Sequence, residues 1–189
     1  LLSPQQQKIS LRAIRQVGVA GFIFLLLGRF IQKKLGKITG LQPGSDMLYA
    51  VNLARNNNLK LALIDKEITK TVRRLFKKLT FKEKWRIFYD IVSAPFSYKK
   101  NKKIQQEAGL DPKTFNLKQI PSQEIIYSLL RVVKKRYPTF YTVLIDERNH
   151  FMARRIILLA KHNPSKKILV VVGAGHKKEM EQLFSLYAA

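Results

Sequence analysis

Apolar and polar residues follow one another along the chain mostly with the spacing of amphipathic helices. Ile68, Val72, Leu75 and Leu79, for example, recur at intervals of four, three and four residues, which places them on one face of a helix. With turn and cap residues marking the ends, the pattern predicts helices at about 9–35, 46–57, 67–78, 80–95, 121–136, 139–161 and 177–186. Ser45 is expected to cap the second of these.

Two short apolar runs do not follow the helical spacing. They are LKLALI at 59–64, which ends at Asp65, and KILVVV at 167–172. Both are apolar on both faces, as buried parallel strands are. Because two strands alone make no stable sheet, further strands would have to come from a preceding segment or a partner chain. The pattern predicts a helix-rich α/β fold with a short, mostly parallel sheet, incomplete at its N-terminus.

The most apolar run, VGVAGFIFLLL at 17–27, lies within the first predicted helix. It is shorter than the roughly 20 residues that span a bilayer, and Arg15 and Arg29 flank it. A buried or interfacial helix is therefore predicted. Gly18 and Gly21 lower its helix propensity, which favours close packing against a neighbour.

One domain is expected over residues 1–189, with a flexible, linker-like insertion at 97–121. The 189 residues suit one domain, and 46% hydrophobic residues argue against intrinsic disorder. The lack of cysteine excludes a disulfide scaffold, a thiolate zinc site and a cysteine nucleophile. The first residue is Leu1 rather than Met, so a preceding segment stays open.

The chain is strongly basic, with 36 Lys and Arg against 12 Asp and Glu and a net charge of +24. The basic residues are spread along the chain and are not interleaved with aromatic residues as in RNA-binding motifs, so nucleic acid is not the expected partner. Solvated helix faces and an anionic membrane surface both stay open. Without a visible secretory signal, we expect a cytoplasmic protein or one attached to the cytoplasmic side of a membrane. The sequence does not set the oligomeric state.

A glycine-containing loop, GAGH at 173–176, follows the stronger predicted strand. Glycines at the carboxyl end of a strand let the main chain pass close to a ligand, and open α/β sheets bind ligands at that edge. Gly173 and Gly175 are therefore candidate substrate-binding residues. His176 is a candidate metal ligand or general base. The alternative is a turn histidine that caps the next helix.

Asp65 ends the other predicted strand and is a second candidate for substrate binding at this edge. The alternative is that it caps the following helix. On that helix, Arg73 or Arg74 would aim a guanidinium at an anion.

Glu147 and Arg148 occupy positions of the 139–161 helix that its periodicity would bury. Buried charges need partners, and adjacent residues on a helix do not face each other. The partners would be a ligand, a metal or another helix.

Four segments, in order, resemble the TraB/PrgY/GumN family, and its archaeal, pheromone-shutdown-like branch most closely. They are PGSDM, LALIDKEITKTVRRL, LIDERNHFMARRI and KILVVVGAGH, within residues 43–75 and 144–176. The resemblance implies a fold like that of erythromycin esterase and ChaN, of which this chain would be the C-terminal portion.

The family's animal relatives are described as metal-dependent peptidases with two G-x-x-H motifs. Gly173 and His176 match the second motif, which implies that His176 is a metal ligand, and the first is not found. Glu147, Arg148 and Asn149 match the family's helix motif, and Thr71 and Arg74 its strand–helix motif. We take the first three and Arg74 as candidate catalytic residues and Thr71 as substrate-binding. The chain departs from the family at Asp46 and Lys66, where Glu and Arg are favoured.

The resemblance thus implies a metal-dependent, peptidase-like hydrolase acting on a peptide signal with Mn, Co or Zn. Because a catalytic metal takes about three protein ligands, His176 would need others from outside this chain. The metal would polarise a carbonyl and activate water, and Arg148 or Arg74 would stabilise the oxyanion. The alternatives are a non-catalytic protein that sequesters a peptide or small ligand, and a basic membrane-associated module.

Overall fold

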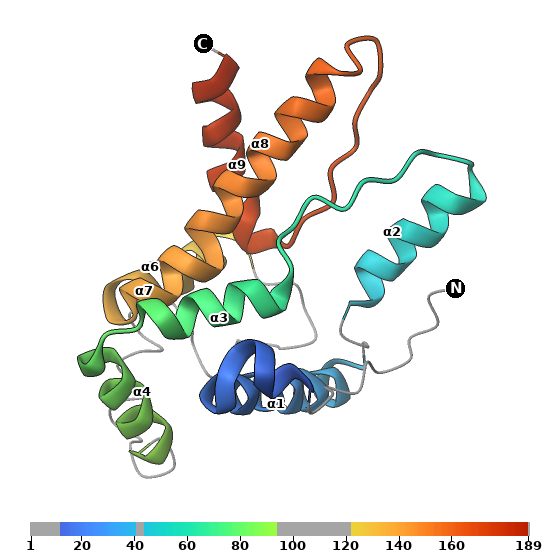
Figure 1. Cartoon of the computed structure of the whole chain (residues 1–189). Coiled ribbons are helices and arrows are strands. Elements are labelled where there is room, and N and C mark those ends of the chain that lie inside the picture. Colours follow the sequence, from blue (N-terminus) through green and yellow to red (C-terminus); the bar gives the residue numbers. More distant parts are fainter. Residues whose placement is uncertain (1–11, 41–43, 94–121, 189) are drawn as a thin grey trace.

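A computed structural model describes residues 12–40, 44–93 and 122–188, and over these ranges the chain is built from helices (Figure 1). The elements are α1 (Arg12–Thr39), α2 (Ser45–Asn56), α3 (Ile68–Lys78), α4 (Phe81–Ser93), α6 (Gln123–Arg136), α7 (Pro138–Tyr141), the π-helical turn η2 (Thr142–Asp146), α8 (Glu147–Lys161) and α9 (Ala174–Ala188). Figure 1 shows α3 lying between α1 and the α7–η2–α8 arm, and it contacts α1, α7 and η2. The predicted insertion at 97–121 lies outside the described residues.

The predicted helices are confirmed, with shifts at their ends. α1 continues to Thr39, beyond the predicted end at residue 35. Gly44, with φ of 80°, occupies the cap position of α2 that Ser45 was expected to take. α9 begins at Ala174, so His176 lies within its first turn instead of in a preceding loop. Among the described helices, none has the length and apolar content needed to cross a membrane.

The predicted parallel sheet is wrong for the described residues, which contain no strand. Segments 60–64 and 167–172 do avoid helix, but no main-chain hydrogen bond joins either to another part of the described chain. Their β-branched and apolar composition favours extended backbone, whereas a strand also needs a neighbour that pairs with its N–H and C=O groups. That neighbour is what the described residues lack.

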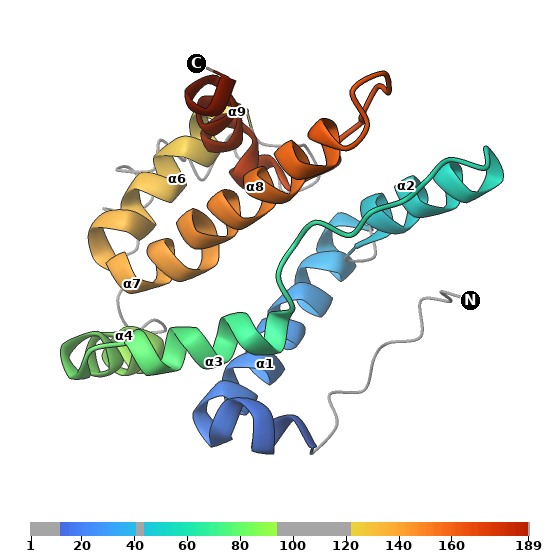
Figure 2. The same cartoon turned by 45° about the horizontal axis from the view of Figure 1, so that its top comes forward.

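Two small hydrophobic clusters hold the helices together. The first contains Leu75, Leu79 and Val143, with Phe24 of α1 packed against it, and so joins α1, α3 and η2. The second joins α8 to α9 and also receives both extended segments. Its members are Met152, Ile156 and Met180, packed with Ile64, Val170, Val172 and Phe184. Figure 2 shows α9 alongside α8, with α6 on the other side of α9, and these neighbours are in contact.

The first helix has apolar residues on two opposite sides. Val17 and Gly21 are buried, and Phe24 belongs to the first cluster, so this side is used in packing. The opposite side is exposed and carries Val19, Ile23, Leu26, Leu27 and Phe30. The helix is kinked at Gly18, where φ is 75° and ψ is 171°, a conformation that side-chain-bearing residues rarely adopt. The prediction of a buried or interfacial helix is therefore confirmed for its buried side.

Gly21 sets the distance between α1 and α3. A Cβ at this position would lie 2.9 Å from Val17 Cβ and 3.2 Å from Val72 Cγ1. We expect Gly21→Leu to lower the free energy of unfolding by about 2 kcal/mol, since the larger side chain forces the helices apart. Gly28→Ala is the matched control, because a Cβ there meets nothing within 4 Å, and it should raise stability by up to about 1 kcal/mol. Urea unfolding followed by circular dichroism measures both, and equal effects would contradict close packing at Gly21.

Candidate active site

Arg148 of α8 joins the helix motif to the end of the extended segment 60–64. Its Nε donates a hydrogen bond to Asp65 Oδ1 at 3.0 Å and its Nη2 to Oδ2 at 2.5 Å, while Nη1 donates to the Leu144 carbonyl at 3.0 Å. Burial raises the pKa of Asp65, but the hydrogen bonds and charge of Arg148 outweigh it and hold that pKa below its ordinary value. Two predicted site residues are thus brought together as an ion pair that persists at neutral pH.

His176 of α9 is buried, and one of its ring nitrogens is bonded to α8. Its Nδ1 lies 2.6 Å from Asn149 Oδ1. The Asn149 amide nitrogen donates to Glu179 Oε2 at 2.6 Å, and the Tyr141 hydroxyl donates to Glu179 Oε1. Because the amide nitrogen is used on Glu179, the amide oxygen accepts a proton from Nδ1–H. The Glu179–Asn149–His176 chain therefore favours the tautomer whose Nε2 keeps a free lone pair.

The environment of His176 keeps the ring neutral. Burial lowers its pKa below the ordinary 6.5, the positive charge of Arg148 lowers it further, and the charge of Asp65 opposes the shift. Within the described part of the chain, no hydrogen bond reaches Nε2. A Cβ on Gly173 would lie 3.7 Å from His176 Cδ2, the carbon next to Nε2, so the glycine leaves this edge of the ring uncrowded. His176 can therefore accept a proton or a metal at neutral pH.

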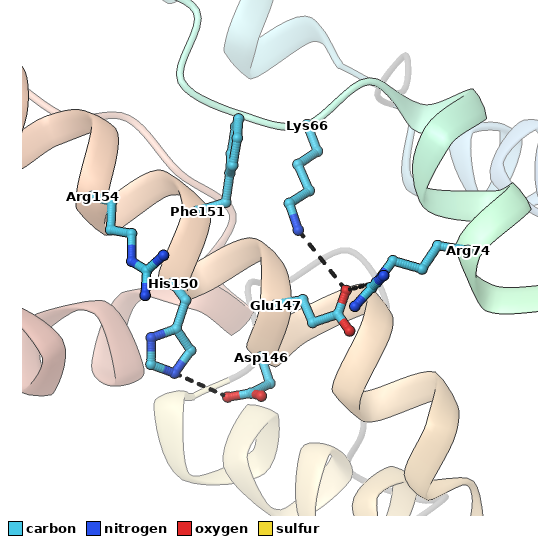
Figure 3. Close-up of a pocket in the computed structure, with 7 residues that line it drawn as sticks. All are labelled: Lys66, Arg74, Asp146, Glu147, His150, Phe151 and Arg154. Atoms are coloured by element: carbon cyan, nitrogen blue, oxygen red, sulfur yellow. Dashed lines mark hydrogen bonds and ion pairs between the residues drawn. The ribbon is translucent and has the colours of Figure 1, made fainter. Parts of the chain in front are cut away.

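Glu147, the residue next to Arg148, faces α3 instead. Arg74 Nε donates to Glu147 Oε2, Lys78 Nζ donates to Oε1 at 2.7 Å, and Lys66 Nζ lies 3.9 Å from Oε2 (Figure 3). Burial raises the pKa of Glu147, but the bonds to Arg74 and Lys78 prevail and lower it. The ion pair with another helix, the alternative from the sequence, is the arrangement that the structure shows for Glu147 and Arg74.

A shallow cavity of about 260 Å³ lies beside this ion-pair cluster. Its lining residues are Lys66, Arg74, Asp146, Glu147, His150, Phe151 and Arg154. Figure 3 shows His150 directed at Asp146, and His150 Nε2 lies 3.6 Å from Asp146 Oδ1. His176 is not part of this lining, so the cavity and the His176 edge are separate features of α8.

The remaining predicted substrate-binding residues differ in their surroundings. Thr71 is buried, and its hydroxyl donates to the Glu67 carbonyl at 3.1 Å, so its polar group is used within the helix. A Cβ on Gly175 would lie 3.8 Å from Leu130 Cδ1, which places Gly175 against α6. Gly173, Asp65, Arg148, Asn149 and His176 are the predicted residues that meet around the start of α9.

Sequence reasoning missed Glu179 and Tyr141. One signal for Glu179 is present: residues 148–178 contain no acidic residue, and Glu179 follows His176 by three positions, which puts both on one side of a helix. Tyr141 has no such signal, since its contact with Glu179 depends on how α7 packs near α9.

The described residues do not fit a divalent metal by themselves. No three His, Asp or Glu side chains gather among them, whereas about three protein ligands are usual at a catalytic metal. Asp65, whose charge acts on His176, is already paired with Arg148. A metal bound at Nε2 would need ligands from elsewhere.

Comparison with known proteins places these motifs in a family. The family model described as "TraB/PrgY/gumN family" matches residues 23–188. An uncharacterized protein of Methanocaldococcus jannaschii is 34% identical over 178 residues, which cover 93% of this chain and 41% of that protein. The chain therefore spans less than half the length of this relative. No solved structure matches. With the family model covering most of its length, including all the site residues above, the chain belongs to the TraB/PrgY/gumN family.

Proposed function

We propose that this chain carries the proton-accepting group of a peptide hydrolase, and that the group is Nε2 of His176. The single observation behind the proposal is the Glu179–Asn149–His176 hydrogen-bond chain, which holds Nδ1 and leaves Nε2 free on a ring whose pKa is lowered. A general base works best when it is neutral, oriented and within reach of water. Asn149 and Glu179 are positioning residues in this scheme, since they act through the imidazole.

The reaction follows from the groups around His176. Nε2 accepts a proton from water as the water oxygen attacks the carbonyl carbon of a peptide bond. Negative charge then develops on the carbonyl oxygen, and a guanidinium is suited to stabilise it. Arg148 keeps N–H groups beyond those bonded to Asp65 and Leu144, since a guanidinium has five donors. The imidazolium returns its proton to the leaving amine as the C–N bond breaks.

The metal dependence implied by the family resemblance belongs to the same proposal in a weaker form. A Mn, Co or Zn ion would polarise the carbonyl and lower the pKa of a bound water. Since the described residues supply too few ligands, the proposal assigns them no step through a metal.

The test is a digest of a mixed peptide pool, read by mass spectrometry, with the chain, His176→Gln and His162→Gln. His162 is an exposed histidine at the end of α8, so its substitution is the matched control. Cleavage should persist in the control and be lost in His176→Gln. Parallel digests contain EDTA, Mn²⁺, Co²⁺ or Zn²⁺. Full cleavage by His176→Gln would refute the role of His176, and cleavage only with added metal would replace the general base by a metal ligand.

A binding protein without turnover is the second candidate. The observation that favours it is that the described residues hold neither a three-ligand metal cluster nor a cysteine. Peptide binding that is insensitive to EDTA, with no cleaved product after long incubation, would establish this alternative.

A further inference from the structure

The extended segment that leads to His176 has unsatisfied main-chain groups. Within the described part of the chain, no hydrogen bond is made by the N–H or C=O groups of residues 167–172. The first main-chain bond after them runs from His176 N to the Gly173 carbonyl at 2.9 Å. Figure 1 shows this segment descending along α8 to the start of α9. A row of unpaired main-chain groups is a template for a further strand.

Side chains along this segment fall into two sets. Val170 and Val172 pack into the cluster of Met152, Ile156 and Met180, which fixes the segment against α8 and α9. Leu169 and Val171 face outward, with exposed fractions of 87% and 46%. Because alternate side chains point to opposite faces of an extended chain, this anchoring also fixes the directions of the main-chain N–H and C=O groups. The segment is a held edge, ready to pair, and not a loose loop.

Charge around this edge has one sign. Residues 148–178 contain no Asp or Glu. They carry Arg148, Arg154, Arg155, Lys161, Lys166, Lys167, Lys177 and Lys178. Lys166 and Lys167 start the segment, and Lys177 and Lys178 follow its end, and all four are exposed. An anionic partner is therefore favoured at both ends of the edge.

We propose that residues 167–172 bind an extended, acidic peptide by strand addition and deliver it to His176. Main-chain hydrogen bonds supply affinity that does not depend on sequence, while alternate side chains of the peptide meet Leu169 and Val171. The inference deepens the proposed function by naming its substrate class, and it rests on that function only for what happens to the peptide at Nε2.

The test uses the His176→Gln chain, so that binding is measured without turnover. The probe is an end-blocked, fluorescein-labelled heptapeptide, Glu-Val-Thr-Val-Thr-Val-Glu, followed by fluorescence anisotropy at low salt. Two further peptides carry N-methyl groups on the three Val amides or on the two Thr amides. Only alternate amides face a partner strand, so one methylated peptide should bind at least tenfold more weakly and the other within about twofold. Equal affinity of all three peptides would overturn strand addition.

Charge is tested with matched variants. Lys166→Glu combined with Lys167→Glu should weaken binding at least fivefold, whereas Lys82→Glu with Lys84→Glu, the same charge change on exposed positions of α4, should not. A Lys-flanked version of the heptapeptide should bind more weakly than the Glu-flanked one. Equal effects of the two double variants would overturn the placement at this edge.

Amide hydrogen exchange locates the contact. On saturation with the heptapeptide, alternate amides within 167–172 should exchange at least tenfold more slowly. Protection of these amides that grows with protein concentration in the absence of peptide would instead assign the edge to a second copy of the chain. Strand-type binding without cleavage by the unsubstituted chain would refute only the proposed function, and cleavage without this protection would refute only the present inference.

Discussion

Replacing Glu83 with leucine is expected to lower the free energy of unfolding at pH 7 by about 3 kcal/mol. The Glu83 carboxylate is buried and ties together the starts of two helices. It accepts hydrogen bonds from Thr80 N and Oγ1 at 3.1 and 3.0 Å, and from Thr139 N and Oγ1 at 3.0 and 2.7 Å. Leucine would leave these partly buried donors of α4 and α7 without an acceptor, and each such loss is costly.

The effect should depend on pH in a definite direction. Burial raises the pKa of Glu83, but the bonds from Thr139 and Thr80 outweigh it, so the pKa in the folded chain lies below its ordinary value. A group with a depressed pKa stabilises the fold above its unfolded pKa of about 4.3, and the stabilisation is lost as pH falls through the folded value. Urea unfolding should therefore show a gap between wild type and Glu83→Leu that narrows below pH 4.

Glu181→Leu is the control for this prediction. Its carboxylate lies on exposed α9, 3.9 Å from Lys177 Nζ, and its side chain is 61% exposed. Exposed pairs of this kind contribute little, so stability should change by less than about 0.5 kcal/mol. A similar loss in both variants, or a Glu83→Leu gap that does not change with pH, would contradict the assignment of Glu83 as a buried, ionised tie.

The contrast between helices and strands shows what local pattern can determine. Helices close their hydrogen bonds within one segment, so Ile68–Lys78 and Gln123–Arg136 were predicted nearly to their ends. A strand closes its hydrogen bonds with another segment. The apolar pattern therefore identified 167–172 as non-helical but could not provide its neighbour, and the inferred sheet was wrong for the described residues.

The site shows the same division. Family motifs brought Asp65, Arg148, Asn149 and His176 to notice, and the structure does join them by hydrogen bonds or electrostatic contact. The partner of Glu147 was left open between a ligand, a metal and another helix, because adjacent helix positions reveal a buried charge without revealing what faces it. The turn η2 adds to this difficulty, since a π-helical turn at Thr142–Asp146 shifts the phase of every later residue relative to a regular helix.

Exchanging Asn149 for aspartate is expected to convert His176 from a base into an acid at neutral pH. Asn149 is 1% exposed and bridges His176 and Glu179. A carboxylate against Nδ1 favours the imidazolium, so the pKa of His176 should rise by about one unit or more. Burial already raises the pKa of Glu179, against the opposing charge of Lys134. Glu179 is therefore the group expected to take up a proton and donate it to the new carboxylate, which keeps the bridge intact.

The consequence is a displaced pH profile rather than a uniform loss. In the unsubstituted chain, peptide cleavage should rise with pH and reach half its maximum below pH 6.5, because the neutral ring is the active form. In Asn149→Asp the same rise should occur about one unit or more higher, so activity at pH 6 falls roughly tenfold and recovers toward pH 8. Proton NMR titration of the His176 ring measures the pKa directly. Asn52→Asp, on an exposed position of α2, is the control for added negative charge. An unchanged His176 pKa would mean that Asn149 does not hold the ring, whereas a raised pKa with an unmoved rate profile would mean that His176 is not the base.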